Sequence, residues 1–212
     1  MIYSKRNKLK VFCIGQNKTG TTTIEHALKE FGYNLGDQKD GEKLFENWIK
    51  RDFNSIINFT KKSNAFQDIP FSLPYTYQVL DQYYPNSKFI LTLRDSDNQW
   101  YNSITQFHKK LWSKNEYLPS LEDLKNADYN YEGFAYDYLR EVYGVDDNDL
   151  YNEEKLKYWY NQYNNDIIRY FKNSNKLLVV NVAINKDYDR LCNFLNKQKL
   201  RNGFEWKNKT KS

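Results

Sequence analysis

Two glycines, Gly15 and Gly20, have the G-x-x-x-x-G spacing of a phosphate-binding loop within the stretch KVFCIGQNKTGTTT. In loops that bind nucleoside triphosphates a lysine follows the second glycine, whereas here the lysine is Lys18, inside the loop. Backbone N–H groups at the start of the following helix bind anions, because they lack intrahelical partners and lie at the positive end of the helix dipole. The alternative is an ordinary strand–helix turn. As an anion site, the loop favours a short anhydride such as a phosphosulfate, with Lys18 just beyond the bound phosphate.

A second candidate anion site follows the stretch KFILTLRDSDNQWYNS, in which Arg94 comes at the end of a predicted strand. Ser103 lies nine residues later, on the next predicted helix. A guanidinium group binds phosphate oxygens through a planar fork of N–H donors. In the alternative interpretation Arg94 pairs with Asp95 or Asp97, and Ser103 is only a helical residue. A ligand with phosphates at both ends would use both sites, and 3′-phosphoadenosine 5′-phosphosulfate (PAPS) is such a ligand.

These two stretches resemble the cofactor motifs of the PAPS-dependent sulfotransferases, more closely the bacterial and Golgi-type branch than the cytosolic one. The resemblance runs from about Lys10 to Gln106 and returns at KLLVVNV. The chain departs from the family pattern at Asn17, where proline is usual, and in the spacing of nine residues rather than eight before the serine. The resemblance implies that PAPS is the sulfuryl donor, that its product 3′,5′-adenosine bisphosphate (PAP) is released, and that no metal is needed. The implied cofactor-binding residues are Lys18 (on the bridging oxygen), Thr19, Gly20, Thr21, Thr22, Arg94 and Ser103.

A candidate catalytic base comes from the second predicted strand, which ends in FQDIP. Cytosolic sulfotransferases carry K-T-H-L-P at this place, with histidine as the base, and Asp68 stands at the matching position. A carboxylate can accept the hydroxyl proton as the new S–O bond forms. The alternative is that Asp68 only caps the next turn. Glu46 is a weaker candidate base.

Three further features bear on substrate and cofactor binding. His108 is a candidate acceptor-side residue by resemblance, although a packing role is the better interpretation. The acidic, tyrosine-rich residues 113–150 form either a lid whose rings stack on sugars or a loop-rich subdomain. In the basic tail, Arg201, Asn202 and Gly203 resemble the family's R-K-G segment, which implies that Arg201 closes over the 3′-phosphate, with Lys207 and Lys209 as alternatives.

The elements that must position these residues alternate along the chain. Short apolar runs that read as buried parallel strands lie at KVFCIG, NAFQDIP, KFILTLR and KLLVVNV, and segments with helical periodicity separate them. This order predicts a three-layer α/β/α fold with a central parallel sheet of the P-loop-containing nucleotide-binding type. In such folds ligands bind at the carboxyl ends of the strands. The predicted helices cover residues 24–31 (with Thr22 as a possible cap), 42–59, 75–84, 100–111, 153–172 and 188–195.

Length and composition exclude several classes of protein. The chain has 212 residues, 40% hydrophobic and 17% aromatic, which predicts one folded domain over residues 1–212 rather than disorder. No run approaches the ~20 apolar residues of a membrane span. The two cysteines, Cys13 and Cys192, form neither a disulfide framework nor a metal site, so a cytoplasmic location is expected. The oligomeric state is left open.

Two other functions compete with sulfuryl transfer. A P-loop kinase acting on a small molecule would need a lysine after Gly20 and an acidic strand end to hold Mg²⁺, and neither is evident. A nucleic-acid-binding module would use the basic tail, but the acidic residues between Glu116 and Glu154 would repel a polyanion. We therefore expect a small-molecule or glycan acceptor, with a carbohydrate or glycolipid hydroxyl favoured, and no nucleic acid.

Overall fold

The computed structural model describes residues 9–115 and 117–205. The chain forms two compact units, one of residues 1–93 and 166–212 and the other of residues 94–165. The expectation of one domain stays a prediction, because two compact units within one chain do not decide whether either of them folds alone.

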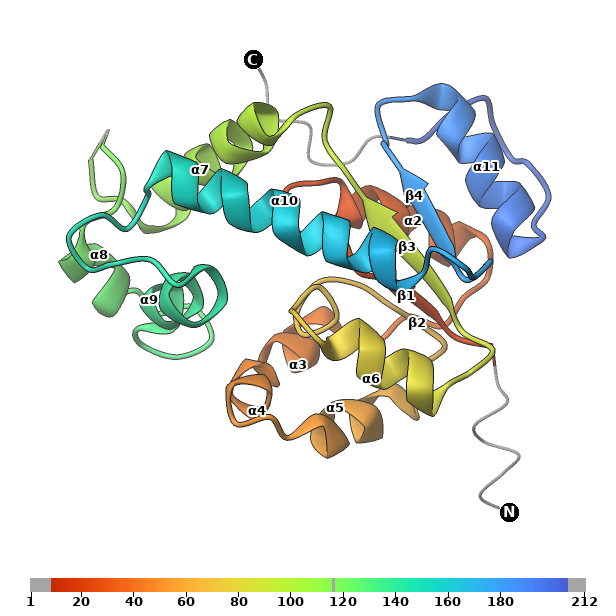
Figure 1. Cartoon of the computed structure of the whole chain (residues 1–212), viewed down its shortest axis with the longest axis horizontal. Coiled ribbons are helices and arrows are strands. Elements are labelled where there is room, and N and C mark those ends of the chain that lie inside the picture. The colour runs from red at the N-terminus through yellow and green to blue at the C-terminus, as the bar shows by residue number, and fades with distance from the viewer. Residues whose placement is uncertain (1–8, 116, 206–212) are drawn as a thin grey trace. The chain divides into compact units, whose positions relative to one another are not determined.

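The first unit contains a parallel sheet of four strands in the order β2-β1-β3-β4 (Figure 1). The strands are short: β1 (Val11–Cys13), β2 (Ala65–Phe66), β3 (Lys88–Thr92) and β4 (Leu177–Val180). The first three are almost fully buried, as expected for parallel strands covered on both faces, whereas buried and partly exposed residues alternate along the edge strand β4. Because all four run in the same direction, their carboxyl ends meet at one edge. The predicted parallel sheet is confirmed.

Side chains alternate between the two faces of this sheet. On one face Val11, Cys13 and Ile90 pack against the apolar sides of α2 (Thr21–Glu30) and α11 (Asn185–Leu195). On the other face the Phe12 ring stacks on Phe66 and Phe89, with centroids 5.3 and 5.6 Å apart. Helices flank both faces, which is the predicted three-layer α/β/α arrangement.

The segment predicted as one helix over residues 42–59 is instead divided between two short helices, and a third short helix ends at its first residue. The three helices are α3 (Gln38–Glu42), α4 (Phe45–Ile49) and α5 (Phe53–Thr60). Arg51 has a φ of 58°, which no α-helix continues through, and the Asp52 carboxylate accepts a hydrogen bond from the Ser55 amide to start α5. The next helix, α6 (Thr76–Tyr83), lies where the prolines predicted it.

The second unit is helical. It contains α7 (Asp97–Trp112), α8 (Leu121–Lys125), α9 (Phe134–Tyr138), a π-helical turn over Leu139–Tyr143, and most of α10 (Glu153–Tyr170). Residues 113–150, expected to be irregular, thus contain two short helices and this turn. The buried side chains of this unit include several aromatic rings, among them Trp100, which is stacked on Tyr160 at 4.5 Å between centroids. Within the described residues, none of the helices has the length and apolar character needed to cross a membrane.

Candidate active site

The loop after β1 is held by contacts with its own residues and with β3. The Thr19 hydroxyl lies 2.5 Å from the Thr92 hydroxyl at the end of β3, and it also donates to the backbone carbonyl of Gln16. Gly15 faces the same threonine so closely that a Cβ there would lie 1.9 Å from Thr92 Oγ1. The glycine is therefore needed for the loop to approach β3.

Helix α2 begins at the end of this loop. Its N-cap is Gly20, with a φ of 106°, and a Cβ on Gly20 would lie 2.6 Å from a methyl group of Val182. Within the described residues, the amides of Gly20, Thr21 and Thr22 donate to no backbone or side-chain acceptor. Three unpaired N–H groups at the start of a helix are the donors of an anion site. The half-buried Lys18 directly precedes Thr19, with its backbone also in the left-handed region at a φ of 69°.

Asp68 follows β2 by two residues and starts a tight turn. Its φ is 62°, and its backbone carbonyl accepts hydrogen bonds from the amides of Phe71 at 2.7 Å and Ser72 at 3.0 Å. Its carboxylate accepts one from the Ile69 amide at 2.9 Å. The side-chain amide of Gln16 donates to the Ser72 carbonyl, so the phosphate loop and this turn are joined. Asp68 therefore does cap the next turn, as the alternative interpretation expects, but this role uses only one of its two carboxyl oxygens.

That second oxygen belongs to a cluster of amide and acidic side chains. The Nε2 of Gln38 lies 3.2 Å from Oδ2 of Asp68 and 2.9 Å from Oε1 of Glu42. Gln67 in turn donates from its Nε2 to Oε1 of Gln38 at 2.9 Å. Glu42 is only 6% exposed, although it lies on a short polar helix. Two acidic side chains are thus bridged by one amide.

The environment of Asp68 suits a proton acceptor that works near neutral pH. Burial, followed by the negative charges of Glu42 and Glu25, raises the pKa of Asp68 to about 7, and the hydrogen bond from the Ile69 amide only partly offsets this. A general base is most effective when its pKa lies near the working pH. Perturbed carboxyl groups of this kind are more frequent at functional sites than elsewhere.

In the second unit, Arg94 and Ser103 are the two residues expected to bind a second anion. Arg94 is half-buried, and burial lowers the pKa of its guanidinium. Its backbone amide donates to the Tyr160 hydroxyl at 3.2 Å. The Ser103 Oγ atom is buried in α7 and has no hydrogen-bond partner among the described residues. A buried hydroxyl without a partner is costly, and a phosphate oxygen would satisfy it.

Glu46 and His108 have surroundings that differ from those of Asp68. Glu46 is exposed on α4 and forms an ion pair with Lys50 at 3.1 Å. His108 is 2% exposed, and its ring lies 4.5 Å from the centroid of Trp112 and 5.8 Å from that of Tyr151. Both surroundings fit a surface or packing role better than a catalytic or substrate role.

Arg201 contacts the far end of α2. Its guanidinium pairs with Glu30, the last residue of that helix, and with Glu205 at 2.6 Å. A helix of 10 residues is about 15 Å long, so Arg201 lies at the opposite end from the phosphate loop. Binding of the 3′-phosphate by Arg201 therefore stays a prediction and requires these ion pairs to break. Lys207 and Lys209 lie outside the described residues.

His26, Glu30 and Glu205 place one possible metal-ligand atom each within 4.8 Å of one another. Both carboxylates of this group are neutralised by Arg201, and His26 Nδ1 is 3.5 Å from Glu30. The group is therefore explained as an ion-pair network that attaches the tail to α2.

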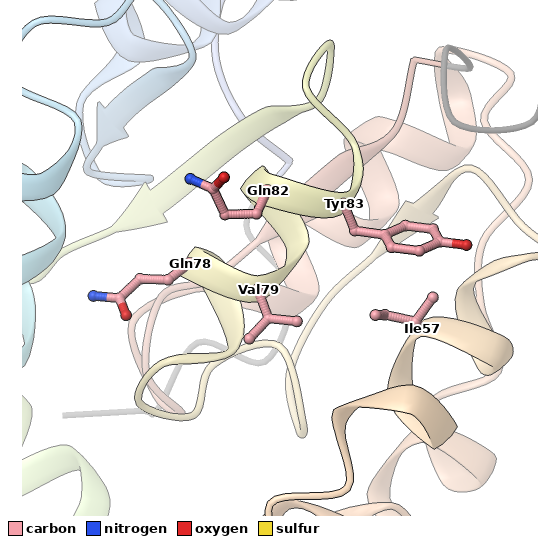
Figure 2. Close-up of a pocket in the computed structure, with 5 residues that line it drawn as sticks. All are labelled: Ile57, Gln78, Val79, Gln82 and Tyr83. Carbon is pink, nitrogen blue, oxygen red and sulfur yellow. The ribbon is translucent and has the colours of Figure 1, made fainter. Parts of the chain in front are cut away.

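A cavity of about 380 Å³ lies between α5 and α6. It is lined by Ile57, Gln78, Val79, Gln82 and Tyr83, with Ile57 across from the α6 side chains (Figure 2). None of the candidate catalytic or cofactor-binding residues lines it.

Sequence reasoning missed Glu42, Gln38 and Gln16. Glu42 and Gln38 lie in the polar stretch GDQKDGEK, which has no apolar periodicity and gives no sign that one carboxyl group is buried. A partial signal is Asp37, whose side chain accepts from the Asp40 amide and caps α3. Gln16 occupies a position of the G-x-x-x-x-G motif at which the motif specifies no residue type.

Comparison with known proteins gives the family. A search of curated proteins found no match. A family model described as a sulfotransferase domain matches residues 10–212, which is nearly the whole chain and includes the phosphate loop, Asp68, Arg94 and Ser103. The chain therefore belongs to the sulfotransferase family and is an enzyme that transfers a sulfuryl group.

Proposed function

We propose that this sulfotransferase moves the sulfuryl group of PAPS to an acceptor hydroxyl by in-line displacement, with Asp68 as the base. The observation that carries the proposal is the link between two neighbouring strand ends. β1 leads into the loop with Lys18, β2 leads to Asp68, and Gln16 joins the two by its hydrogen bond to Ser72.

The residues present fit a phosphosulfate. The unpaired amides of Gly20, Thr21 and Thr22 would hold the 5′-phosphate, and Lys18 would neutralise the bridging oxygen. Arg94 and the partnerless hydroxyl of Ser103 would bind the 3′-phosphate. PAPS supplies an activated sulfuryl group and leaves as PAP.

The proposed reaction forms one S–O bond and breaks another. The acceptor oxygen bonds to sulfur, the bond from sulfur to the bridging oxygen breaks, and the hydroxyl proton passes to Asp68. Lys18 stabilises the charge on the leaving oxygen, as oxyanion donors do in acyl transfer. The match to the sulfotransferase model supports sulfuryl transfer over the phosphoryl transfer of a kinase.

For the acceptor we propose a carbohydrate or glycolipid hydroxyl. Support comes from the carboxyl base and from aromatic side chains of residues 113–150 that reach the surface, with Tyr117 78% and Tyr129 45% exposed. The buried thiols of Cys13 and Cys192 form no disulfide, which supports the proposed cytoplasmic location.

The test has two stages. Thermal-shift measurements should show stabilisation by PAP at concentrations where 5′-AMP and ATP have a smaller effect. Transfer of ³⁵S from labelled PAPS to a panel of sugars, glycolipids, phenols and steroids should then identify the acceptor class. Stabilisation by ATP and Mg²⁺ but not by PAP would contradict the proposal.

A further inference from the structure

Gln38 lies between two acidic side chains and contacts both. Its Nε2 is 2.9 Å from Glu42 Oε1 and 3.2 Å from Asp68 Oδ2. A side-chain amide nitrogen carries two hydrogens, so one can be donated to each carboxyl group. Gln38 is therefore able to hold the two acidic groups at the same time, although they repel each other when both are charged.

Gln67 fixes the orientation of this amide. The Nε2 of Gln67 donates to the Oε1 of Gln38 at 2.9 Å, so the oxygen of Gln38 faces a donor and its nitrogen faces the carboxyl groups. A flipped amide would direct its oxygen at two acidic side chains and lose all three contacts. Gln67 itself is 7% exposed and follows β2 directly, which gives it a rigid base.

We propose that Gln38, oriented by Gln67, is a positioning residue of the proposed sulfuryl transfer: it holds the Asp68 carboxyl group in the orientation that accepts the acceptor's proton. This inference rests on the proposed role of Asp68 as the base. It adds two residues, from two different segments, for which neither the loop motif nor the family match gives a role.

The charged and titratable groups around Asp68 show why a donor is needed. Glu42 on α3 and Glu25 on α2 both repel a charged Asp68. Burial, and to a lesser degree the charge of Asp68, raises the pKa of the Cys13 thiol on β1. A donor to Oδ2 favours the charged, proton-accepting form of Asp68. Loss of that donor is therefore expected to raise the pKa of Asp68, and a rise of one unit from about 7 would lower the charged fraction at pH 7 about five-fold.

The experiment uses the full chain with Gln38→Met, which keeps the length of the side chain and removes the donor. ¹³C NMR titration of the Asp68 carboxyl carbon should show a higher pKa than in the unchanged protein. The acid limb of the kcat–pH profile should move in the same direction, kcat at pH 7 should fall several-fold, and PAP affinity should stay within about two-fold. Gln82→Met, at an exposed glutamine of α6, is the matched control and should change none of these.

Three comparisons decide between outcomes. Gln67→Met keeps the donor of Gln38 but no longer fixes the orientation of its amide, so a smaller rise of the Asp68 pKa is expected. This variant replaces Gln38→Met as the test if Gln38→Met folds poorly. In an Asp68→Asn background Gln38→Met should add no further loss of kcat. An unchanged Asp68 pKa, or an additive loss in the double variant, would overturn the positioning role. If Gln38→Met shifts the Asp68 pKa but the unchanged protein transfers no sulfuryl group, the contact between Gln38 and Asp68 is supported and the proposed function is rejected.

Discussion

The side-chain amide of Gln16 donates a hydrogen bond to the backbone carbonyl of Ser72, 56 residues later. Gln16 is fully buried at the start of the phosphate loop, and Ser72 closes the turn that begins at Asp68. The loop proposed to bind the donor and the turn proposed to carry the base are thus one connected structure. Changes on either side can be tested for separate effects on binding and on turnover.

Lys18→Ala should lower kcat by ~10²–10³-fold, the usual cost of losing one donor to a developing oxyanion. PAP affinity, measured by calorimetry, should fall much less, because the charge on the bridging oxygen builds mainly in the transition state. Lys29→Ala, at an exposed lysine of helix α2, which follows the loop, is the control. Loss of binding with unchanged turnover would reject the assignment.

Arg94→Ala should weaken the binding of PAP by ~1.5–3 kcal/mol, the cost of losing a charge-assisted hydrogen bond. Binding of 5′-AMP should be nearly unchanged, because that ligand has no 3′-phosphate. Ser103→Ala should act in the same direction with a smaller effect. Arg169→Ala, at an exposed arginine, provides the control. Equal losses for PAP and 5′-AMP would count against a 3′-phosphate site.

Asp68→Asn should bind PAP normally and nearly stop sulfuryl transfer, because it keeps the shape and removes the basicity. Glu42→Gln should keep activity and move the acid limb of the rate profile below pH 7, since it removes a charge that raises the pKa of Asp68. Rates between pH 5 and 9 measure both effects. The reverse result, an active Asp68→Asn and an inactive Glu42→Gln, would make Glu42 the base.

Asp68→Asn should also raise Tm near pH 8. The pKa of Asp68 is about 7 in the folded protein and ~3.9 in an unfolded chain, so the unfolded chain holds fewer protons between those values. Stability of the unchanged protein therefore falls as pH rises from about 4 to 7 and then levels off. The gain in Tm should be larger at pH 8 than at pH 5, and scanning calorimetry at both values measures it. An equal gain in Tm at pH 5 and pH 8 would show that ionisation of Asp68 does not lower the stability of the folded protein.

Gly20→Ala should lower both stability and PAP affinity. The left-handed backbone at a φ of 106° costs ~1 kcal/mol for alanine, and the Cβ would also meet Val182. Gly32→Ala is a matched control, since Gly32 has a φ of 79° but nothing within 4 Å of its Cβ position. Chemical unfolding should show a larger loss for Gly20→Ala, and only that variant should lose PAP binding. Similar losses in both would mean that contact with Val182 is unimportant.

The sheet and the order of its elements were predictable because buried parallel strands are continuous apolar runs, as in KFILTLR. The phosphate loop was predictable because the spacing of its glycines and the start of the following helix depend on residues that are close together in the sequence. Asp68 was proposed as the base from its place at a strand end and from the resemblance of FQDIP to K-T-H-L-P. Each of these signals is carried by neighbouring residues in the sequence.

Partners supplied by distant segments were not predictable in this way. Glu42 comes close to Asp68 only because α3 begins beside β2, where the Gly36 amide donates to the Ala65 carbonyl at 2.9 Å. The short helices within 113–150 were also missed, although Ser120 and Asp123 form a capping box that the sequence contains as S-L-E-D. Those helices lack the length that makes periodicity visible.

The contacts of the phosphate loop also set the order in which the protein can assemble. Thr19 pairs with Thr92, 73 residues later, and Gly20 packs against Val182 beyond β4. Non-local contacts of this kind form slowly, because a long stretch of chain must close before they stabilise anything. A nascent chain that has left the ribosome only as far as α5 carries the complete loop motif but none of these partners. Donor binding is therefore expected only after synthesis has passed β4, so a PAP analogue would stabilise the finished protein without assisting its earlier folding intermediates.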